Sequence, residues 1–308
     1  MANANLALVS PEPPERPKVT QVRRPGRAYI GWMPPQNAHL ILQSGAVEPD
    51  EAAAISITER ARRAVEARPA GVNQDDLISP VPDELAGHVR ELQDSPAAQP
   101  YHAEGWKVAL VDLTRVCGCQ PLVVSDQAAA RVASIDPDDI AAIAAVTLPL
   151  TQGESVPVRF DPLQRTWTVV STSHNLRIVV PAGPQPVPST GEMVVPPEGT
   201  VLGFGVASPP SFMQVGRFRG RHFLRDGYHR ALGLLNRGIT VAPAFVRDIT
   251  AFEELFPDPR TLLPQDSYFG ERPPVLQDLL NDTVSATVQV PATQKAIVIS
   301  GMEFPLAG

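Results

Sequence analysis

Apolar residues recur along the chain at two spacings, one typical of helices and one typical of strands. Three- and four-residue spacing predicts a helix that Asp50 opens, and further short helices follow in the first half of the chain. Apolar runs such as WKVALVDL predict strands. The predicted helices of this half cover residues 50–68, 82–93, 125–132 and 137–145, and the predicted strands cover residues 106–113 and 122–124. Ser134 or Asp136 is the expected cap of the last helix.

Alternating apolar and polar residues in the second half favour antiparallel strands. Three short segments, residues 156–160, 166–170 and 176–180, are expected to form a β-meander. Two further segments, residues 284–290 and 295–299, are expected to form a hairpin. Helices and strands therefore mix along the chain, and the predicted fold class is α/β in the broad sense that includes α+β.

Residues 216–247 combine the strongest local signals in the chain. A predicted strand over residues 218–224 leads into Asp226-Gly227, a turn in which Asp226 also suits a helix N-cap. Apolar residues at helical spacing follow, and Gly238 is the expected end of that helix. A buried strand is expected next, so the stretch should fold as strand, turn, helix and strand.

Positive charge is concentrated in this stretch. Residues 213–237 hold six arginines and one acid, a net charge of +5 in a chain whose total is −7. A regular strand would place four of them on one face, namely Arg217, Arg219, Arg221 and Arg225. Arg225 would then lie beside the helix N-terminus, where amides and guanidinium groups form an anion site suited to phosphate. The ordinary alternative is a solvated basic strand beside a capped helix.

The segment RDGYHRA, residues 225–231, resembles the central box of the ParB/sulfiredoxin-like superfamily. The resemblance implies an α/β domain with a mixed sheet and N-terminal helices, in which the turn before the helix holds the phosphates of a nucleotide. It implies a turn at Asp226-Gly227 and phosphate contacts by His229 and Arg230. The candidate ligand-binding residues are Arg219, Arg221, Arg225, Gly227, Tyr228, His229 and Arg230. CTP or ATP with Mg²⁺ are the candidate ligands, and the choice between them stays open.

Two departures from the superfamily pattern narrow the implied function. Tyr228 occupies the position of the catalytic cysteine of sulfiredoxins, so reduction of sulfinic acids is not expected. Chromosome-partitioning members carry a helix-turn-helix after the box, whereas residues 252–274 are rich in proline and aromatic residues here. Sequence-specific DNA binding by such a module is therefore not expected.

Proline makes up 34 of the 308 residues, about twice the usual ~5%, which predicts short elements joined by stiff loops. We expect a disordered tail over residues 1–28 and a helical region over residues 29–100. The α/β core is expected over residues 101–250, with the β-meander as an insertion at about residues 151–206. A loop-rich extension over residues 251–308 is expected to end in the hairpin.

Composition restricts the expected partners and compartment. The net charge of −7 and the pI of about 5.4 argue against a general nucleic-acid coat. No apolar run of about 18 residues and no signal peptide are visible, so a cytoplasmic protein without a membrane partner is expected. Cys117 and Cys119, the two cysteines, cannot supply four zinc ligands and are expected to be buried free thiols. No metal site is predicted.

Three functions follow from these patterns. The leading hypothesis is binding of a nucleotide or another phosphorylated small molecule at residues 227–230, with hydrolysis or transfer of phosphate left open. Asp226 is the candidate general base or metal-binding carboxylate, and its ordinary alternative is a helix cap. A DNA-binding or nuclease protein of ParB-like type is the second hypothesis. The third is a non-catalytic interaction protein whose basic strand binds an acidic partner.

Overall fold

The computed structural model describes residues 22–44, 50–150, 156–171, 176–179, 205–256 and 261–300, which form a mixed α+β protein as the sequence predicts. The helices are α1 (Pro35–Gln43), α2 (Glu51–Glu66), η1 (Asp83–Leu85), α3 (Ala86–Asp94), α4 (Gln99–Ala103), α5 (Ser125–Val132), α6 (Ile140–Thr147), α7 (Tyr228–Asn236), α8 (Phe252–Leu255), α9 (Gln265–Phe269) and η3 (Leu276–Leu280). The strands are β1 (Arg23–Ala28), β2 (Ile78–Ser79), β3 (Lys107–Asp112), β4 (Leu122–Val124), β5 (Val158–Asp161), β6 (Thr166–Ser171), β7 (Arg177–Val179), β8 (Gly205–Ala207), β9 (Gln214–Phe218), β10 (Arg221–Asp226), β11 (Val241–Asp248), β12 (Ala286–Pro291) and β13 (Lys295–Ser300).

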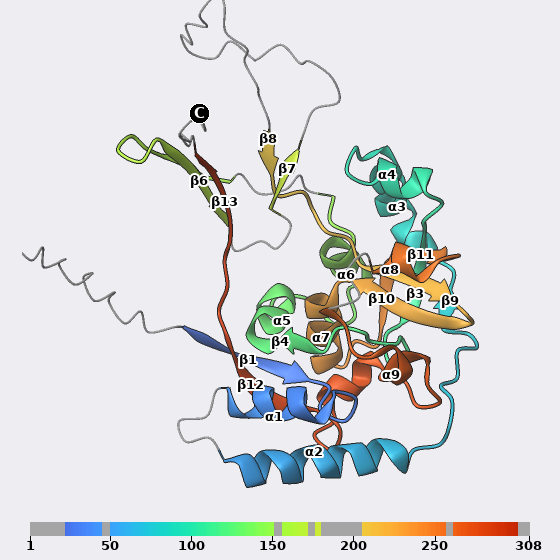
Figure 1. Cartoon of the computed structure of the whole chain (residues 1–308). Coiled ribbons are helices and arrows are strands. Elements are labelled where there is room, and N and C mark those ends of the chain that lie inside the picture. The colour runs from blue at the N-terminus through green and yellow to red at the C-terminus, as the bar shows by residue number, and fades with distance from the viewer. Residues whose placement is uncertain are drawn as a thin grey trace, which may run out of the picture.

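A five-stranded mixed sheet, in the order β10-β9-β11-β3-β2, carries the central stretch of the chain. β9 and β11 are parallel, and the other neighbouring strands are antiparallel. Val111, Val215 and Phe245 of these strands are fully buried. Helix α7 connects β10 to β11 and packs along α5, as Figure 1 shows near the middle of the molecule. The predicted mixed sheet is confirmed, whereas its ParB/sulfiredoxin-like type stays a prediction.

A second sheet has the order β12-β1-β4, with α1 packed against β12 and α2 packed against α1 (Figure 1). β1 lies within residues 1–28, so the predicted disordered tail is wrong at its end, and residues 1–21 lie outside the described residues. The sequence of β1, RRPGRA, lacks β-branched and aromatic residues, and the strand forms because β12 and β4 pair with its two edges. β4 pairs only with residues 26–28, so Pro25, which has no N–H, lies outside that ladder.

A third, small sheet has the order β13-β6-β5. The hairpin of β5 and β6 agrees with the predicted meander, but β7 pairs with β8, and the third place beside β6 belongs to β13. The predicted hairpin of β12 and β13 is wrong as well, because β12 pairs with β1. Residues 180–204 of the predicted insertion lie outside the described residues. Alternation of side chains identifies a strand and does not encode a partner far away in the sequence.

The central stretch departs from the prediction at Arg219-Gly220. These two residues have φ angles of 52° and 75° and form a two-residue turn between β9 and β10. The single strand predicted over residues 218–224 is therefore wrong, and a hairpin stands in its place, in which Arg221 pairs with Phe218. The four arginines do not line one face of one strand, because the turn reverses the chain between them.

Two helix boundaries follow the predicted signals. Asp50 caps α2, since its carboxylate accepts from the Ala53 amide at 2.9 Å. Gly238, with a φ of 77°, follows the last turn of α7. The Ile239 amide then donates back to the Leu234 carbonyl at 3.0 Å, which completes a glycine-based helix end.

Two predicted caps are wrong. Asp139 caps α6 by accepting from a first-turn amide at 2.9 Å, so neither Ser134 nor Asp136 has this role. The N-cap of α7 is Gly227, whose φ of 105° is accessible to glycine and strained for other residues. No side chain caps this helix, and Asp226 is instead the last residue of β10. The carboxylate of Asp226 is therefore available for another role.

A buried histidine on β10 makes the stability of the fold depend on pH. His222 is 7% exposed, and its backbone N–H donates to Gln74 Oε1 at 2.8 Å. Burial, assisted by the charge of Arg217 and opposed by Asp248, lowers the pKa of His222 to about 4. The unfolded chain takes up this proton near pH 6.5, so the free energy of unfolding should fall by about 1–2 kcal/mol between pH 7 and pH 5. Urea unfolding measures the fall, and an equally large fall in His222→Gln would contradict this assignment.

Candidate functional site

The segment with both cysteines runs through the core beside the RDGYHRA segment. Cys117 and Cys119 are buried free thiols, as predicted. The Cys117 amide donates to the His222 carbonyl of β10 at 2.8 Å. Tyr228 binds the other end of the cysteine segment, because its hydroxyl accepts from the Cys119 amide at 2.9 Å and from the Gln120 amide at 3.2 Å. Burial raises the pKa of Tyr228 well above its usual value, so the neutral hydroxyl is a core group that anchors this segment.

Arg230 also lies inside the protein. Its side chain is 5% exposed, and its guanidinium donates to the carbonyls of Thr147 and Ser211 and to the Ser211 hydroxyl. Asp226 Oδ1 lies 3.8 Å from Arg230 Nη2. Burial lowers the pKa of Arg230 to about 10, so the group stays charged at neutral pH. Arg230 therefore joins α7 to the end of α6 and to the segment before β9.

The other predicted residues lie at separate places along the hairpin and α7. Arg219 is in the turn of the hairpin, with its guanidinium carbon 5.1 Å from the centroid of the Phe218 ring. Arg221 begins β10 and donates to the Tyr268 carbonyl at 2.7 Å. Arg219 and Arg221 therefore lie at or just before the start of β10, whereas α7 follows the end of this strand. His229 is half-buried in the first turn of α7. The structure thus does not bring all the predicted phosphate ligands together.

Arg225 and Asp226, at the end of β10 that leads into α7, line a cavity of about 450 Å³, named here the Arg225 cavity. Its lining residues are Tyr101, Gln214, Arg225, Asp226, Leu255, Phe256, Thr261 and Leu262. Arg225 Nη1 donates to Gln214 Oε1 at 2.8 Å, and the guanidinium carbon lies 5.5 Å from the centroid of the Trp106 ring. The hydrogen bond uses one of the five N–H donors of the guanidinium, so a fixed cation retains capacity to bind an anion.

A second hollow, of about 480 Å³, shares Arg225 and Tyr101 with the Arg225 cavity. We name it the proline hollow. Its other lining residues are Ala97, Pro100, Glu104, Ile178, Ala207, Pro209 and Pro210. Most of these side chains are aliphatic. A ligand that binds Arg225 therefore has polar surroundings in one hollow and mainly apolar surroundings in the other.

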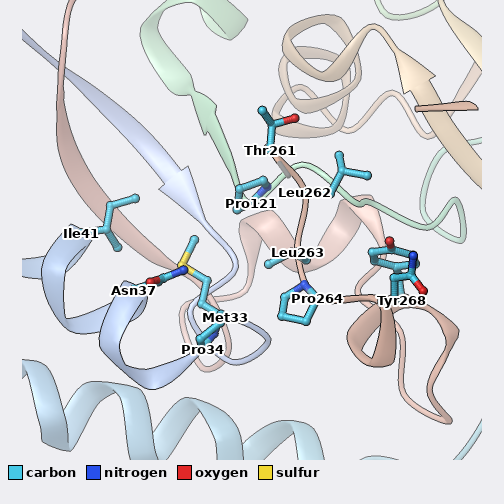
Figure 2. A pocket seen from close by; sticks show the side chains of 11 residues that line it. Met33, Pro34, Asn37, Ile41, Pro121, Thr261, Leu262, Leu263, Pro264 and Tyr268 are labelled. Carbon is cyan, nitrogen blue, oxygen red and sulfur yellow. The ribbon is translucent and has the colours of Figure 1, made fainter. Parts of the chain in front are cut away.

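Figure 2 shows a third depression, of about 550 Å³, between α1 and the segment that leads into α9. Its lining residues are Met33, Pro34, Asn37, Ile41, Pro121, Thr261, Leu262, Leu263, Pro264, Gln265 and Tyr268. None of these residues is charged, and the two amides of Asn37 and Gln265 are its most polar groups. The side chains that line this depression include no cation, whereas Arg225 lines the Arg225 cavity.

Three residues of this region are not among the predicted site residues: Tyr101 and Gln214, which line the Arg225 cavity, and Trp106, whose ring contacts Arg225. Gln214 interrupts an apolar run, FMQV, and is 4% exposed, so a polar residue inside a buried strand was the available signal. Its Oε1 accepts from Arg225. Tyr101 and Trp106 come from α4 and from the residue before β3, and only the tertiary fold brings them to β10.

Three comparisons with known proteins bear on the identity of this site. Searches against protein-family models, curated proteins and solved structures give no match to this chain. Among the described residues, no three His, Cys, Asp or Glu side chains gather as a metal-binding group. No helix in the described ranges has both the length and the apolar character needed to cross a bilayer. The cytoplasmic location stays a prediction, and function is inferred from the residues of the site.

Proposed function

We propose that this protein binds a phosphorylated small molecule, in particular a nucleotide, in the Arg225 cavity. The observation that supports this most is the guanidinium of Arg225, which Gln214 and the Trp106 ring hold at the cavity wall. A guanidinium fork matches two phosphate oxygens, and prior fixation reduces the entropy lost on binding. The site lies directly before α7, and the resemblance of RDGYHRA to nucleotide-binding members of the ParB/sulfiredoxin-like superfamily supports the same class of ligand.

Asp226 supplies the second polar group of the proposed site. Its side chain is 44% exposed and lines the cavity next to Arg225. One carboxylate can accept hydrogen bonds from ribose hydroxyls, or bind Mg²⁺ that the phosphates also coordinate. The proline hollow, which shares Arg225 with the cavity, offers space for the base and sugar. CTP and ATP with Mg²⁺ are therefore the ligands to test first, and the proposal covers binding without a catalytic step.

The structure changes the part that Arg230 plays in this proposal. Its guanidinium is occupied by carbonyls of the protein, so it fixes the first turn of α7 and does not reach the ligand. Other arginines of the hairpin are engaged as well, since Arg217 binds both carboxylate oxygens of Asp248, at 2.6 and 3.0 Å. Internal pairing of these charges favours a local anion site over a basic strip for DNA or for an acidic protein.

A nucleotide supplied at a hundred times its dissociation constant should raise the free energy of unfolding by about 2.7 kcal/mol. Thermal unfolding of the full chain with nucleoside mono-, di- and triphosphates, with and without Mg²⁺, measures this stabilisation. Arg225→Gln should weaken binding at least tenfold, because a charge-assisted hydrogen bond contributes about 1.5–3 kcal/mol.

Arg217→Gln is the matched control, because it removes the same charge from an exposed residue that does not line the cavity. This variant should keep the full stabilisation by nucleotide. Asp226→Asn should weaken the Mg²⁺-dependent part of the stabilisation only. The proposal fails if no phosphorylated ligand stabilises the protein, or if the Arg217 and Arg225 variants lose binding to the same extent.

A further inference from the structure

The small sheet of β13, β6 and β5 has one apolar face. Paired residues of neighbouring antiparallel strands share a face, as do residues two apart on one strand. Phe160 pairs with Trp167, which pairs with Ile299. The face that contains them carries six apolar residues, Val158, Phe160, Trp167, Val169, Ile297 and Ile299, with the pair Ser171 and Lys295 at its end. The opposite face is mixed, with Arg159, Asp161, Thr166, Thr168 and Ser300 beside Val170, Ala296 and Val298.

Much of this apolar face is exposed. Val158 is 55% exposed, and Phe160 and Trp167 are 48% exposed each, while Val169 at the centre is buried. The rings of Phe160 and Trp167 lie 4.5 Å apart between centroids, so they form one aromatic patch. Within the described residues, the three strands contact mainly one another, and Figure 1 shows the β5–β6 hairpin standing away from the larger sheets.

β5 and β13 are the two edge strands of this sheet, and among the described strands β6 is the one ladder partner of β5. An edge strand with exposed apolar residues presents backbone N–H and C=O groups on which another strand can pair. β5 (VRFD) has no inward charge, because its valine and phenylalanine lie on the apolar face and its two charged residues, Arg159 and Asp161, lie on the other face.

We propose that β5 pairs with β5 of a second copy of this chain, antiparallel and around a two-fold axis at Phe160. In this register Phe160 lies opposite Phe160 of the second copy. Arg159 lies opposite Asp161 of the second copy, and Asp161 lies opposite Arg159. Two ion pairs therefore form across the new ladder, on the face opposite the aromatic patch.

Charge complementarity selects a second copy over an unrelated strand. The segment Arg159-Phe160-Asp161 is complementary to itself when it runs antiparallel, because opposite charges flank the central residue. Parallel pairing would place like charges near each other. Asp161 Oδ1 also accepts from the amides of Leu163 and Gln164, at 2.9 and 3.1 Å, which holds the carboxylate at the end of the strand. The product is a six-stranded sheet with one continuous apolar face.

Sedimentation velocity of the full chain over a range of concentrations tests this pairing. The chain should be a dimer at high concentration, and Arg159→Glu should raise the dimer dissociation constant about tenfold, since both cross-strand pairs become repulsive. The double variant Arg159→Glu/Asp161→Asn should recover part of the loss, because asparagine keeps the turn acceptor without the charge. Arg60→Glu, on the exposed face of α2, is the control with the same charge change and should dimerise like the parent chain.

Cross-linking tests the register. Opposite residues of an antiparallel pair have Cα atoms about 4.5–5.5 Å apart, within the range of a disulfide, so Phe160→Cys should form a cross-linked dimer under mild oxidation. Leu163→Cys, at a position that is 94% exposed but outside the proposed pairs, should not. The native cysteines are buried and do not compete. A parent chain that stays monomeric at every concentration, or an Arg159→Glu variant that dimerises as tightly as the parent, overturns the proposal.

Discussion

Replacement of Arg230 by methionine is expected to lower the free energy of unfolding by about 2–4 kcal/mol. Methionine fills much of the same space, but it removes the donors to the carbonyls of Ser211 and Thr147. A buried acceptor left without a donor costs about 1–3 kcal/mol. The Ser211 carbonyl and hydroxyl lose the Arg230 guanidinium, whereas the Thr147 carbonyl keeps the Met213 amide as a donor at 2.8 Å. The ion pair with Asp226 across 3.8 Å is lost as well. The expected loss of stability is large because the Arg230 side chain is only 5% exposed.

Urea unfolding at neutral pH measures this loss, with Arg217→Met as the control. Arg217 has the same chemistry, but its side chain is 53% exposed and pairs with Asp248 at the surface. A surface ion pair contributes about 0–1 kcal/mol, so the control should lose little stability. A loss below about 1 kcal/mol in Arg230→Met would show that the buried hydrogen bonds of this residue are not important for the fold.

The same result decides how ligand-binding experiments on this protein are interpreted. A variant of Arg230 that no longer binds a nucleotide would report a damaged α7, because its guanidinium holds that helix to Thr147 and Ser211. Arg225 is the better probe, since it lines the cavity and its guanidinium donates to the side chain of Gln214 and not to backbone carbonyls of other elements in the described part of the chain. Loss of binding in Arg225→Gln with unchanged stability would separate ligand contact from folding.

Local signals account for the elements that could be predicted from the sequence. Asp50 opens α2 and Gly238 ends α7, because a capping carboxylate and a left-handed glycine act within a few residues. The apolar run that ends at Asp112 forms β3, and the next apolar run along the chain, after Pro121, forms β4. In each case the physical cause lies in the segment itself.

Contacts between distant segments account for the elements that could not be predicted. RRPGRA has no intrinsic preference for a strand, and it becomes β1 because two other strands pair with it. β13 takes the place of β7 beside β6 for the same kind of reason. The turn at Arg219-Gly220 has a different cause. It was not predicted, although Gly220 lies between two strand-like runs and a glycine in that place is a local turn signal.

One part of the candidate site could be predicted from the sequence, and another part could not. The charge count predicts an anion site near Arg225, and the position of that residue before a helix follows from the local sequence. Which guanidinium groups face the cavity depends on packing that the sequence does not show. Arg230 lies one helical turn after Asp226 and points to the carbonyl of Ser211, whereas Arg225 lies at the cavity wall. Two arginines of one short segment thus have different surroundings, and only the fold distinguishes the structural role of Arg230 from the ligand-binding role proposed for Arg225.

Gly233→Ala is expected to lower the free energy of unfolding by about 2–3 kcal/mol, although alanine is the better helix former. A Cβ atom at Gly233 would lie 2.4 Å from the Ala128 backbone oxygen and 2.9 Å from Val132 Cγ2, both on α5. A backbone oxygen inside a helix cannot rotate away, so α5 and α7 would have to separate. These two helices pack along each other, and α7 directly follows Arg225 and Asp226 in the chain, so the strain would fall on the element next to the proposed site.

Gly87→Ala is the matched control, because Gly87 is also helical and nothing lies within 4 Å of its added Cβ. The same substitution should therefore raise the free energy of unfolding there, by about 0.5–1 kcal/mol. Urea unfolding of the two variants under one condition gives opposite signs if close contact between α5 and α7 is the cause. Equal and small changes at both positions would mean that the two helices can move apart at little cost, and that α7 is not held firmly enough to fix Arg225 for a ligand.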